Sequence, residues 1–228
     1  MTRAARAAAL VEAFARIHPD AHCELDYRNP LELLIATILS AQCTDKRVNL
    51  VTKELFRVCR TAADYAALPA EQLEDLILSA GFFRAKAKNI RACCAELVAR
   101  HHGKVPADMA ALTALAGVGR KTANVVLGNV FGINEGVVVD THVQRLSQRL
   151  GLTKHGDPAR IEQDLIKLIP RDKWALFSHW LIWHGRRRCF ARNPDCLGCE
   201  VRTLCPSAGK CGKPPRESPR LAAALHRR

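Results

Sequence analysis

The stretch Leu115-Ala-Gly-Val-Gly-Arg-Lys-Thr-Ala123 joins a glycine-rich turn to the start of a helix. Gly117 and Gly119 flank one apolar residue, so the backbone can turn sharply there and approach another molecule closely. Valines at helical spacing then predict a helix from Arg120 to Val130. Because a helix start presents unpaired N–H groups and the positive end of the helix dipole, this stretch is suited to bind an anion such as a phosphate. An ordinary turn between two helices is the alternative.

The composition is that of a globular protein with a strong positive charge. The chain has 228 residues, 48% of them hydrophobic, which allows one large core or two modest ones. Its apolar runs are shorter than the ~18 residues of a membrane span, and its N-terminus has no apolar signal region, so a cytoplasmic protein is expected. The formal net charge is +13, of which +5 comes from residues 206–228. A polyanionic partner is therefore expected.

Helical periodicity along most of the chain predicts an all-α fold. A first helix carries Leu10, Phe14 and Ile17 on one face. Further helices are expected at residues 30–39, 45–56, 86–101, 109–115, 120–130, 143–150, 161–169 and 174–186. Thr61 and Asp64 form a plausible capping box, and Pro69 suits the first turn of a short helix. Strand signals are limited to 137–139, which is too short for a sheet.

Four cysteines follow the last expected helix at the spacing Cys-x6-Cys-x2-Cys-x5-Cys. They lie within 17 residues of low helical periodicity and can converge on one metal centre; they are Cys189, Cys196, Cys199 and Cys205. Zinc and a 4Fe–4S cluster both accept four thiolates, but a zinc ribbon usually has two Cys-x2-Cys pairs and this segment has one. Structural thiols without metal are the third alternative. Arg186 and its basic neighbours beside the first cysteine are either phosphate-binding cations or a solvated charged face.

The glycine-rich stretch, the sequence Val139-Asp-Thr-His142 and the cysteine spacing together resemble endonuclease III, a family of helix-hairpin-helix DNA glycosylases. The resemblance covers roughly residues 1–205. It implies a six-helix barrel with the hairpin at 24–134, and a second domain at 1–23 and 135–205 that carries a 4Fe–4S cluster. Duplex DNA with damaged bases or abasic sites would be the partner. Residues 206–228 have the composition of a disordered basic arm.

The resemblance and the chemistry of an amine assign the catalytic roles to Lys121 and Asp140. Attack of the lysine amine on the sugar C1′ would expel the base and leave a Schiff base, which permits β-elimination of the 3′ phosphate. The carboxylate would stabilise the cationic sugar or carry the lysine proton. Asp140 can also be only the N-cap of the helix that follows it, and the two roles are compatible.

Two connectors match the loops with which the family fills the hole left by an extruded base. They carry Gln42, within Ser40–Asp45, and Phe82, after Gly81. The alternatives are a polar helix end for Gln42 and a core side chain for Phe82. The full set of expected DNA-binding residues is Gln42, Phe82, Gly117, Val118, Gly119, Arg120, His142 and Arg186.

The expected function is that of a bifunctional DNA glycosylase and AP lyase, which excises damaged, oxidised pyrimidines during base excision repair. The protein is expected to act as a monomer on nucleoid DNA, with a 4Fe–4S cluster as its cofactor. A monofunctional glycosylase is one alternative, although such relatives lack a lysine at position 121. An iron–sulfur DNA-binding protein is the other, but it gives no reason for Lys121 and Asp140 to occur together in these motifs.

Overall fold

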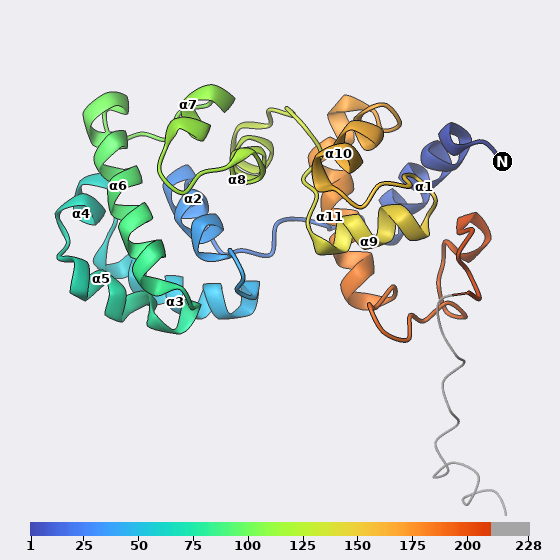
Figure 1. The fold of residues 1–228 in the computed structure, drawn as a ribbon, viewed down its shortest axis with the longest axis horizontal. Coiled ribbons are helices and arrows are strands. Elements are labelled where there is room, and N and C mark those ends of the chain that lie inside the picture. Colours follow the sequence, from blue (N-terminus) through green and yellow to red (C-terminus); the bar gives the residue numbers. More distant parts are fainter. Residues whose placement is uncertain (211–228) are drawn as a thin grey trace, which may run out of the picture. The chain divides into compact units, whose positions relative to one another are not determined.

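The computed structural model describes residues 1–210, and the regular secondary structure of this part of the chain is all helical (Figure 1). The α-helices are α1 (Arg3–Ile17), α2 (Pro30–Leu39), α3 (Asp45–Val58), α4 (Ala62–Ala67), α5 (Ala70–Ile77), α6 (Phe83–His101), α7 (Met109–Ala114), α8 (Arg120–Val126), α9 (Thr141–Arg149), α10 (Pro158–Ile166) and α11 (Trp174–Arg187). Single tighter or wider turns are η1 (Leu78–Ala80), η2 (Leu127–Phe131), η3 (Arg171–Lys173) and η4 (Arg202–Leu204). Residues 1–210 contain no strand, so the all-α fold class is confirmed.

The ends of the described chain differ from the sequence expectation in one respect. Most of the expected disordered arm, 206–228, lies outside the described residues, as does Cys211. Its first residues, 206–210, form hydrogen-bonded turns, in which Ala208 N–H donates to Cys205 O at 3.1 Å.

Among the described residues, no helix is both long and apolar enough to cross a bilayer.

The chain divides into two compact units. The first unit comprises Met1–Ala21, Val139–Pro170 and the described residues from Leu176 onward, and the second comprises His22–Val138 with Arg171–Ala175. The segment 171–175 is separated in sequence from the rest of the second unit but bonds to it. Arg171 Nε donates to Asn134 O at 3.0 Å, and Ala175 N–H donates to Asn134 Oδ1 at 3.2 Å. The expected barrel segment, 24–134, lies entirely within the second unit.

Helix α2 is the centre of the second unit. Every residue from Leu33 to Leu39 is buried, and α3, α6 and α8 pack against this helix. A helix that is apolar on all sides must be surrounded by others, and this explains its sequence of leucines and isoleucines. Its start is set by Asn29, whose side chain accepts from Glu32 N–H, and by Pro30 in the first turn.

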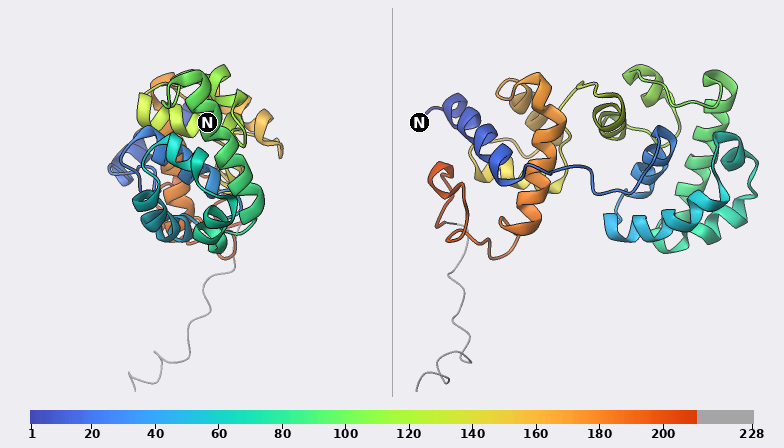
Figure 2. Two further views of the ribbon diagram at one scale, coloured as in Figure 1. Left: turned by 90° about the vertical axis from the view of Figure 1, so that its left-hand side faces the viewer. Right: turned by 180° about the vertical axis from the view of Figure 1, so that it is seen from behind.

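The core of the first unit is aromatic. Figure 2 shows the N-terminal helix α1 beside α11, and Phe14 on α1 packs edge-on against Phe177 and His184 on α11, with ring centroids 6.4 and 5.1 Å apart. Leu10 and Phe14 are fully buried, as the spacing on the first helix predicts, whereas Ile17 is half-buried. The N-terminal helix therefore completes a core whose other side chains lie more than 120 residues later in the sequence.

Local caps follow the sequence signals closely. Thr44 caps α3, and Thr61 with Asp64 forms the predicted capping box of α4. Pro69 is the N-cap of α5 rather than a first-turn residue, so that prediction was one position wrong. Helix α6 begins three residues before the predicted start at Lys86, because Phe82 adopts a left-handed conformation and starts the helix there.

The predicted helix 120–130 is interrupted. Regular α-helical hydrogen bonding ends at Val126, and residues 127–131 form a wider π-type turn, closed by Ile133 N–H donating to Leu127 O at 3.0 Å. Gly128 lies in this turn, and a Cβ atom there would be 2.8 Å from Cβ of Ala175. Close packing against the 171–175 segment thus requires the glycine.

We expect Gly128→Ala to destabilise the protein by about 1–3 kcal/mol, because the added methyl group overpacks the contact with Ala175. Urea unfolding followed by circular dichroism measures the change. In the double variant Gly128→Ala/Ala175→Gly, one methyl group is added at position 128 and the methyl group that it would overlap is removed from position 175. The two substitutions should therefore couple favourably by about 1 kcal/mol or more, and simple additivity would contradict the steric explanation.

Candidate active site and metal centre

The glycine-rich stretch forms a tight turn between α7 and α8. Gly117 has φ of +75°, in the region that favours glycine, and a Cβ there would meet Cβ of Asn89 on α6 at 2.9 Å. Val118 is buried and its N–H donates to Leu115 O at 3.1 Å, so both its side chain and its amide serve the turn itself. Gly119 is the N-cap of α8 and has no side-chain acceptor. The first-turn N–H groups of α8 are therefore not capped by Gly119.

Lys121 is the second residue of α8, and its side chain is exposed. Arg120, one residue before it, donates through Nη2 to Glu135 O at 2.9 Å, which ties the start of α8 to the segment that leaves η2. Two contacts thus fix the helix start that carries the amine. Gly117 packs closely against Asn89, and Arg120 bonds to Glu135 O. The geometry offers an accessible primary amine beside a turn suited to phosphate.

The two expected wedge residues share an unusual backbone conformation. Gln42, in the connector between α2 and α3, has φ of +53°, and Phe82, the N-cap of α6, has φ of +50°. Left-handed conformations are uncommon for residues other than glycine and persist where the surroundings hold them. Both side chains are exposed, with 66% of Phe82 open to solvent. The core alternative for Phe82 is therefore excluded.

Asp140 belongs to the first unit and is the N-cap of α9. Its Oδ1 accepts from Val143 N–H at 2.7 Å, so the capping role is present. This bond uses one carboxylate oxygen, which leaves the chemical role compatible with it. His142, in the first turn of the same helix, is half-buried, with Nδ1 3.1 Å from Nη2 of Arg145.

The four cysteines of the C-terminal segment line one pocket in the first unit, together with side chains of α9 and α11. Arg149 of α9 holds the start of the segment, because its Nη1 donates to Cys189 Sγ at 3.2 Å and to Phe190 O at 2.7 Å. Arg145, one turn earlier, donates to Cys189 O at 3.1 Å. The segment is thus fixed by arginines as well as by its small core.

The arginines next to Cys189 mostly make contacts within the first unit. Arg188 pairs with Asp195 at 3.3 Å and with Glu200 at 3.2 Å, and so neutralises two acids of the cysteine segment. Arg187 lies 3.8 Å from the centre of the Trp183 ring. Arg186, the one arginine of this group in the expected DNA-binding set, is half-buried near the end of α11.

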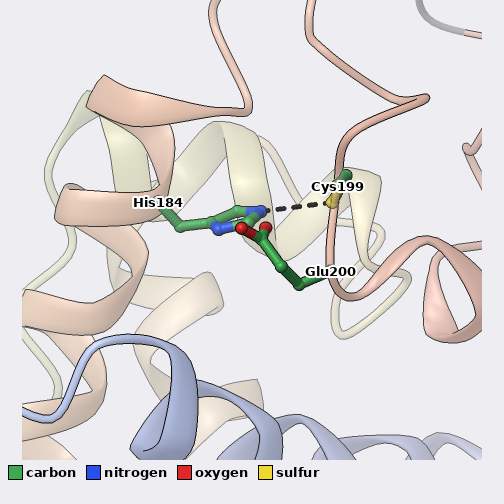
Figure 3. Close-up of side chains that lie close together, drawn as sticks. All are labelled: His184, Cys199 and Glu200. Carbon is green, nitrogen blue, oxygen red and sulfur yellow. Dashed lines mark hydrogen bonds between the residues drawn. The ribbon is translucent and has the colours of Figure 1, made fainter.

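His184 is a potential ligand that the sequence analysis missed. Figure 3 shows its ring facing Cys199 and Glu200; Nε2 lies 3.4 Å from Cys199 Sγ, and the ligand atoms of the three residues are within 4.8 Å of one another. On its other side, Nδ1 is 3.3 Å from Nε2 of His18. Burial lowers the pKa of His184 to about 4, so the ring is neutral at pH 7. The signal in the sequence that could have indicated this ligand is the position of His184, five residues before Cys189.

The donor set fits a thiolate-bound metal centre. Burial raises the pKa of the Cys199 thiol to about 11, so this sulfur stays protonated at pH 7 unless a metal displaces its proton. Arg149 directs an N–H group at the sulfur of Cys189, and His184 can do so at Cys199; such hydrogen bonds stabilise metal-bound thiolates. His184 and Glu200 next to Cys199 offer a mixed nitrogen, oxygen and sulfur set that zinc also accepts.

Comparison with known proteins shows the family to which the chain belongs. The model of the HhH-GPD superfamily of base excision DNA repair proteins matches residues 35–171. Endonuclease III of Synechocystis sp. is 54% identical over 203 residues, which cover 89% of this chain and 93% of that protein. Solved structures of a non-covalent endonuclease III–DNA complex and of a trapped endonuclease III–DNA covalent intermediate each superpose with a TM-score of 0.87 at 46% identity, and cover 92% of this chain and 98% of theirs. The chain therefore belongs to the endonuclease III family within the HhH-GPD superfamily of base excision DNA repair proteins.

Proposed function

We propose that this protein is a bifunctional DNA glycosylase and AP lyase that removes damaged, oxidised pyrimidines from duplex DNA. The observation that carries the proposal is the exposed amine of Lys121 in the first turn of α8, directly after the glycine turn. A related chain, 46% identical, has been trapped as a covalent intermediate with DNA; a covalent bond to DNA needs a nucleophile, and a lysine amine is one of the side chains that can serve. We expect the protein to act as a monomer in the cytoplasm, on nucleoid DNA.

The reaction begins when the neutral amine of Lys121 attacks the sugar C1′ and the bond from C1′ to the base breaks. The base departs with the one proton that the lysine nitrogen gives up. The sugar ring then opens as O4′ takes a proton from solvent, and the amine and C1′ form a protonated Schiff base. This electron-withdrawing group acidifies the C2′ proton, whose removal expels the 3′ phosphate and cuts the strand. Water then releases the lysine.

Asp140 is assigned to the charge changes in this sequence of steps. A carboxylate can stabilise positive charge on the sugar as the base leaves, and can accept the proton that the lysine loses on attack. Because its Oδ1 is engaged by Val143 N–H, Oδ2 is the oxygen assigned to the chemistry. The capping bond holds the carboxylate in one orientation, which suits a group that must act repeatedly at the same place.

DNA contacts are assigned to two kinds of residue. The hairpin residues Gly117, Gly119 and Arg120, with His142 and Arg186, would bind phosphates and set the register of the duplex. Gln42 and Phe82 would fill the space left by the extruded base, and their exposed, left-handed positions support this role. The buried side chain and engaged amide of Val118 leave it a role in shaping the turn.

The proposed cofactor is a 4Fe–4S cluster held by Cys189, Cys196, Cys199 and Cys205. When bound, it would join four points of a segment that has little core of its own, and so supply folding free energy. Because the proposed reaction transfers no electrons, the role that we assign to the cluster is structural. The support is the pocket shared by the four cysteines and the hydrogen-bond donors that face two of their sulfurs.

We expect Lys121→Gln to abolish both strand cleavage at abasic sites and borohydride trapping of protein on DNA. Glutamine keeps much of the length of lysine but has no nucleophilic nitrogen. Gel electrophoresis of trapped complexes and of cleaved strands measures both effects. Lys154→Gln, which changes an exposed lysine of the first unit, should behave like the wild type. Trapping of the Lys121 variant at the normal level would assign the nucleophile to another amine.

Asp140→Asn should lower turnover by ~10²-fold or more while the melting temperature changes little. The asparagine oxygen can still accept from Val143 N–H, so the cap is retained and only the charge is lost. Single-turnover assays and thermal melting give the two quantities. Asp157→Asn is the matched control, because Asp157 caps α10 through the same bond, to Arg160 N–H at 3.0 Å. A variant of Asp140 that melts early but reacts at the normal rate would make it a cap only.

Protein purified without oxygen should contain about four irons per chain. Cys199→Ser should lose most of this iron and give less soluble protein, since a lost ligand removes binding and folding free energy. Metal analysis by mass spectrometry measures the content, and Cys23→Ser, outside the C-terminal segment, should retain the iron. Stoichiometric zinc without iron would contradict the cluster and favour a site that includes His184 and Glu200.

A further inference from the structure

A lysine is buried in the second unit, outside the catalytic and metal residues. Lys86 lies in the first turns of α6 with only 5% of its surface exposed. Its Nζ donates to Leu39 O at 2.8 Å and to Ala80 O at 2.9 Å. A buried ammonium is costly unless hydrogen bonds replace its water, and these two carbonyls do so.

The two carbonyls stand at the bases of the two wedge loops. Leu39 is the last residue of α2, and the connector that carries Gln42 begins directly after it. Ala80 is the last residue of η1, and Gly81 and Phe82 follow it. Helix ends leave carbonyl groups without intrahelical partners, and one ammonium satisfies one such group at each end. Lys86 therefore joins two loops that are about 40 residues apart in sequence.

Lys86 also holds the second loop through its backbone. Its N–H donates to Phe82 O at 3.0 Å in the first turn of α6. Lys86 therefore bonds both to Ala80, before Phe82, and to Phe82 itself. Both loop tips have left-handed backbones at non-glycine residues, with φ of +53° at Gln42 and +50° at Phe82. Such conformations last only where neighbouring contacts hold them, and the Lys86 ammonium provides a contact at the base of each loop.

A lysine at this position is not explained by packing alone. Ala87, Ile90, Cys93 and Cys94 of α6 are buried, so an apolar residue at 86 would extend the same face. Burial lowers the pKa of Lys86 because the interior disfavours the charged form, although the nearby Cys43 acts in the opposite direction. What the lysine provides, and an apolar side chain cannot, is a pair of hydrogen bonds to two separate loops.

We propose that Lys86 is a positioning residue that couples the two wedge loops, so that Gln42 and Phe82 are held ready to enter the DNA stack together. The inference rests on the proposed function, because it needs a base to be extruded. It assigns Lys86 no contact with DNA and no part in the chemistry at Lys121. Its effect should appear in base extrusion and be absent where there is no base to extrude.

The test uses the full chain with Lys121→Gln, in which strand chemistry is blocked and extrusion can be followed alone. The substrate is a duplex with 2-aminopurine beside an oxidised pyrimidine, and the rise in fluorescence reports unstacking. Adding Lys86→Met should slow this rise by about 10-fold or more, since small displacements of positioned groups have large effects on rates. The matched control is Lys88→Met, which removes an exposed lysine from the same helix and should change the rate less than about 2-fold.

Two further measurements distinguish positioning from a general loss of structure. In the chain with Lys121 intact, Lys86→Met should cleave a preformed abasic site at nearly the wild-type rate, after active protein is counted by borohydride trapping. In a Phe82→Ala/Gln42→Ala background, Lys86→Met should slow extrusion by less than about 2-fold, because the groups it positions are gone. Equal losses on damaged and abasic DNA, or a full additional loss in that background, would overturn the proposal.

Failure of the proposed function gives a different result. If the wild-type chain neither traps nor cuts abasic DNA, the assignment of Lys121 is wrong, but the fluorescence experiment still reports extrusion. If trapping succeeds and Lys86→Met unstacks the reporter at the rate of Lys88→Met, the lyase assignment stands and the coupling by Lys86 is refuted.

Discussion

The interior ammonium of Lys86 must keep hydrogen-bond partners, and this requirement organises the proposed DNA-facing part of the second unit. It is met by the ends of α2 and η1, so the two loops that follow these elements start from fixed points. The same helix carries Asn89, which lies under Gly117 and leaves no room for a side chain there. Helix α6 thus contacts the bases of both proposed wedge loops and the hairpin turn, which is the kind of support that a preorganised site needs.

The first unit meets a different constraint, because its C-terminal segment has little apolar core. Arg145 and Arg149 from α9 bind carbonyls beside Cys189, and Arg188 binds two acids further along the segment. These bonds order the backbone, whereas the proposed metal would join the four sulfurs. Positive side chains that could have faced DNA are used within the unit instead, and this lowers the number of arginines left for phosphate contacts.

Asp140 illustrates how one residue can serve structure and chemistry without conflict. A carboxylate has two oxygens, and the cap on α9 occupies only Oδ1. The capping bond restricts the rotation of the side chain, which is an advantage for the proposed role of accepting a proton or facing a developing cation. Asp140 therefore has two compatible roles. One is the cap, which can be predicted from the sequence, and the other is the proposed role in catalysis.

Local rules predicted the presence of most helices, because caps such as Thr44 and the Thr61–Asp64 pair act within four residues and apolar spacing is a property of one helix. The glycine turn, the lysine after it and the cysteine spacing were readable for the same reason. Local rules missed the interruption after Val126 and the early start of α6, which depend on tertiary packing and on the left-handed backbone of Phe82. The partners of Lys86, Arg149 and His184 lie 6 to 166 residues away, and only the packed chain brings them into contact. In the sequence Lys86 was only the first residue of a predicted helix, and which carbonyls it would bind depended on where α2 and η1 end. Tertiary structure alone decided that, since a buried charge takes whatever partners the fold places within reach.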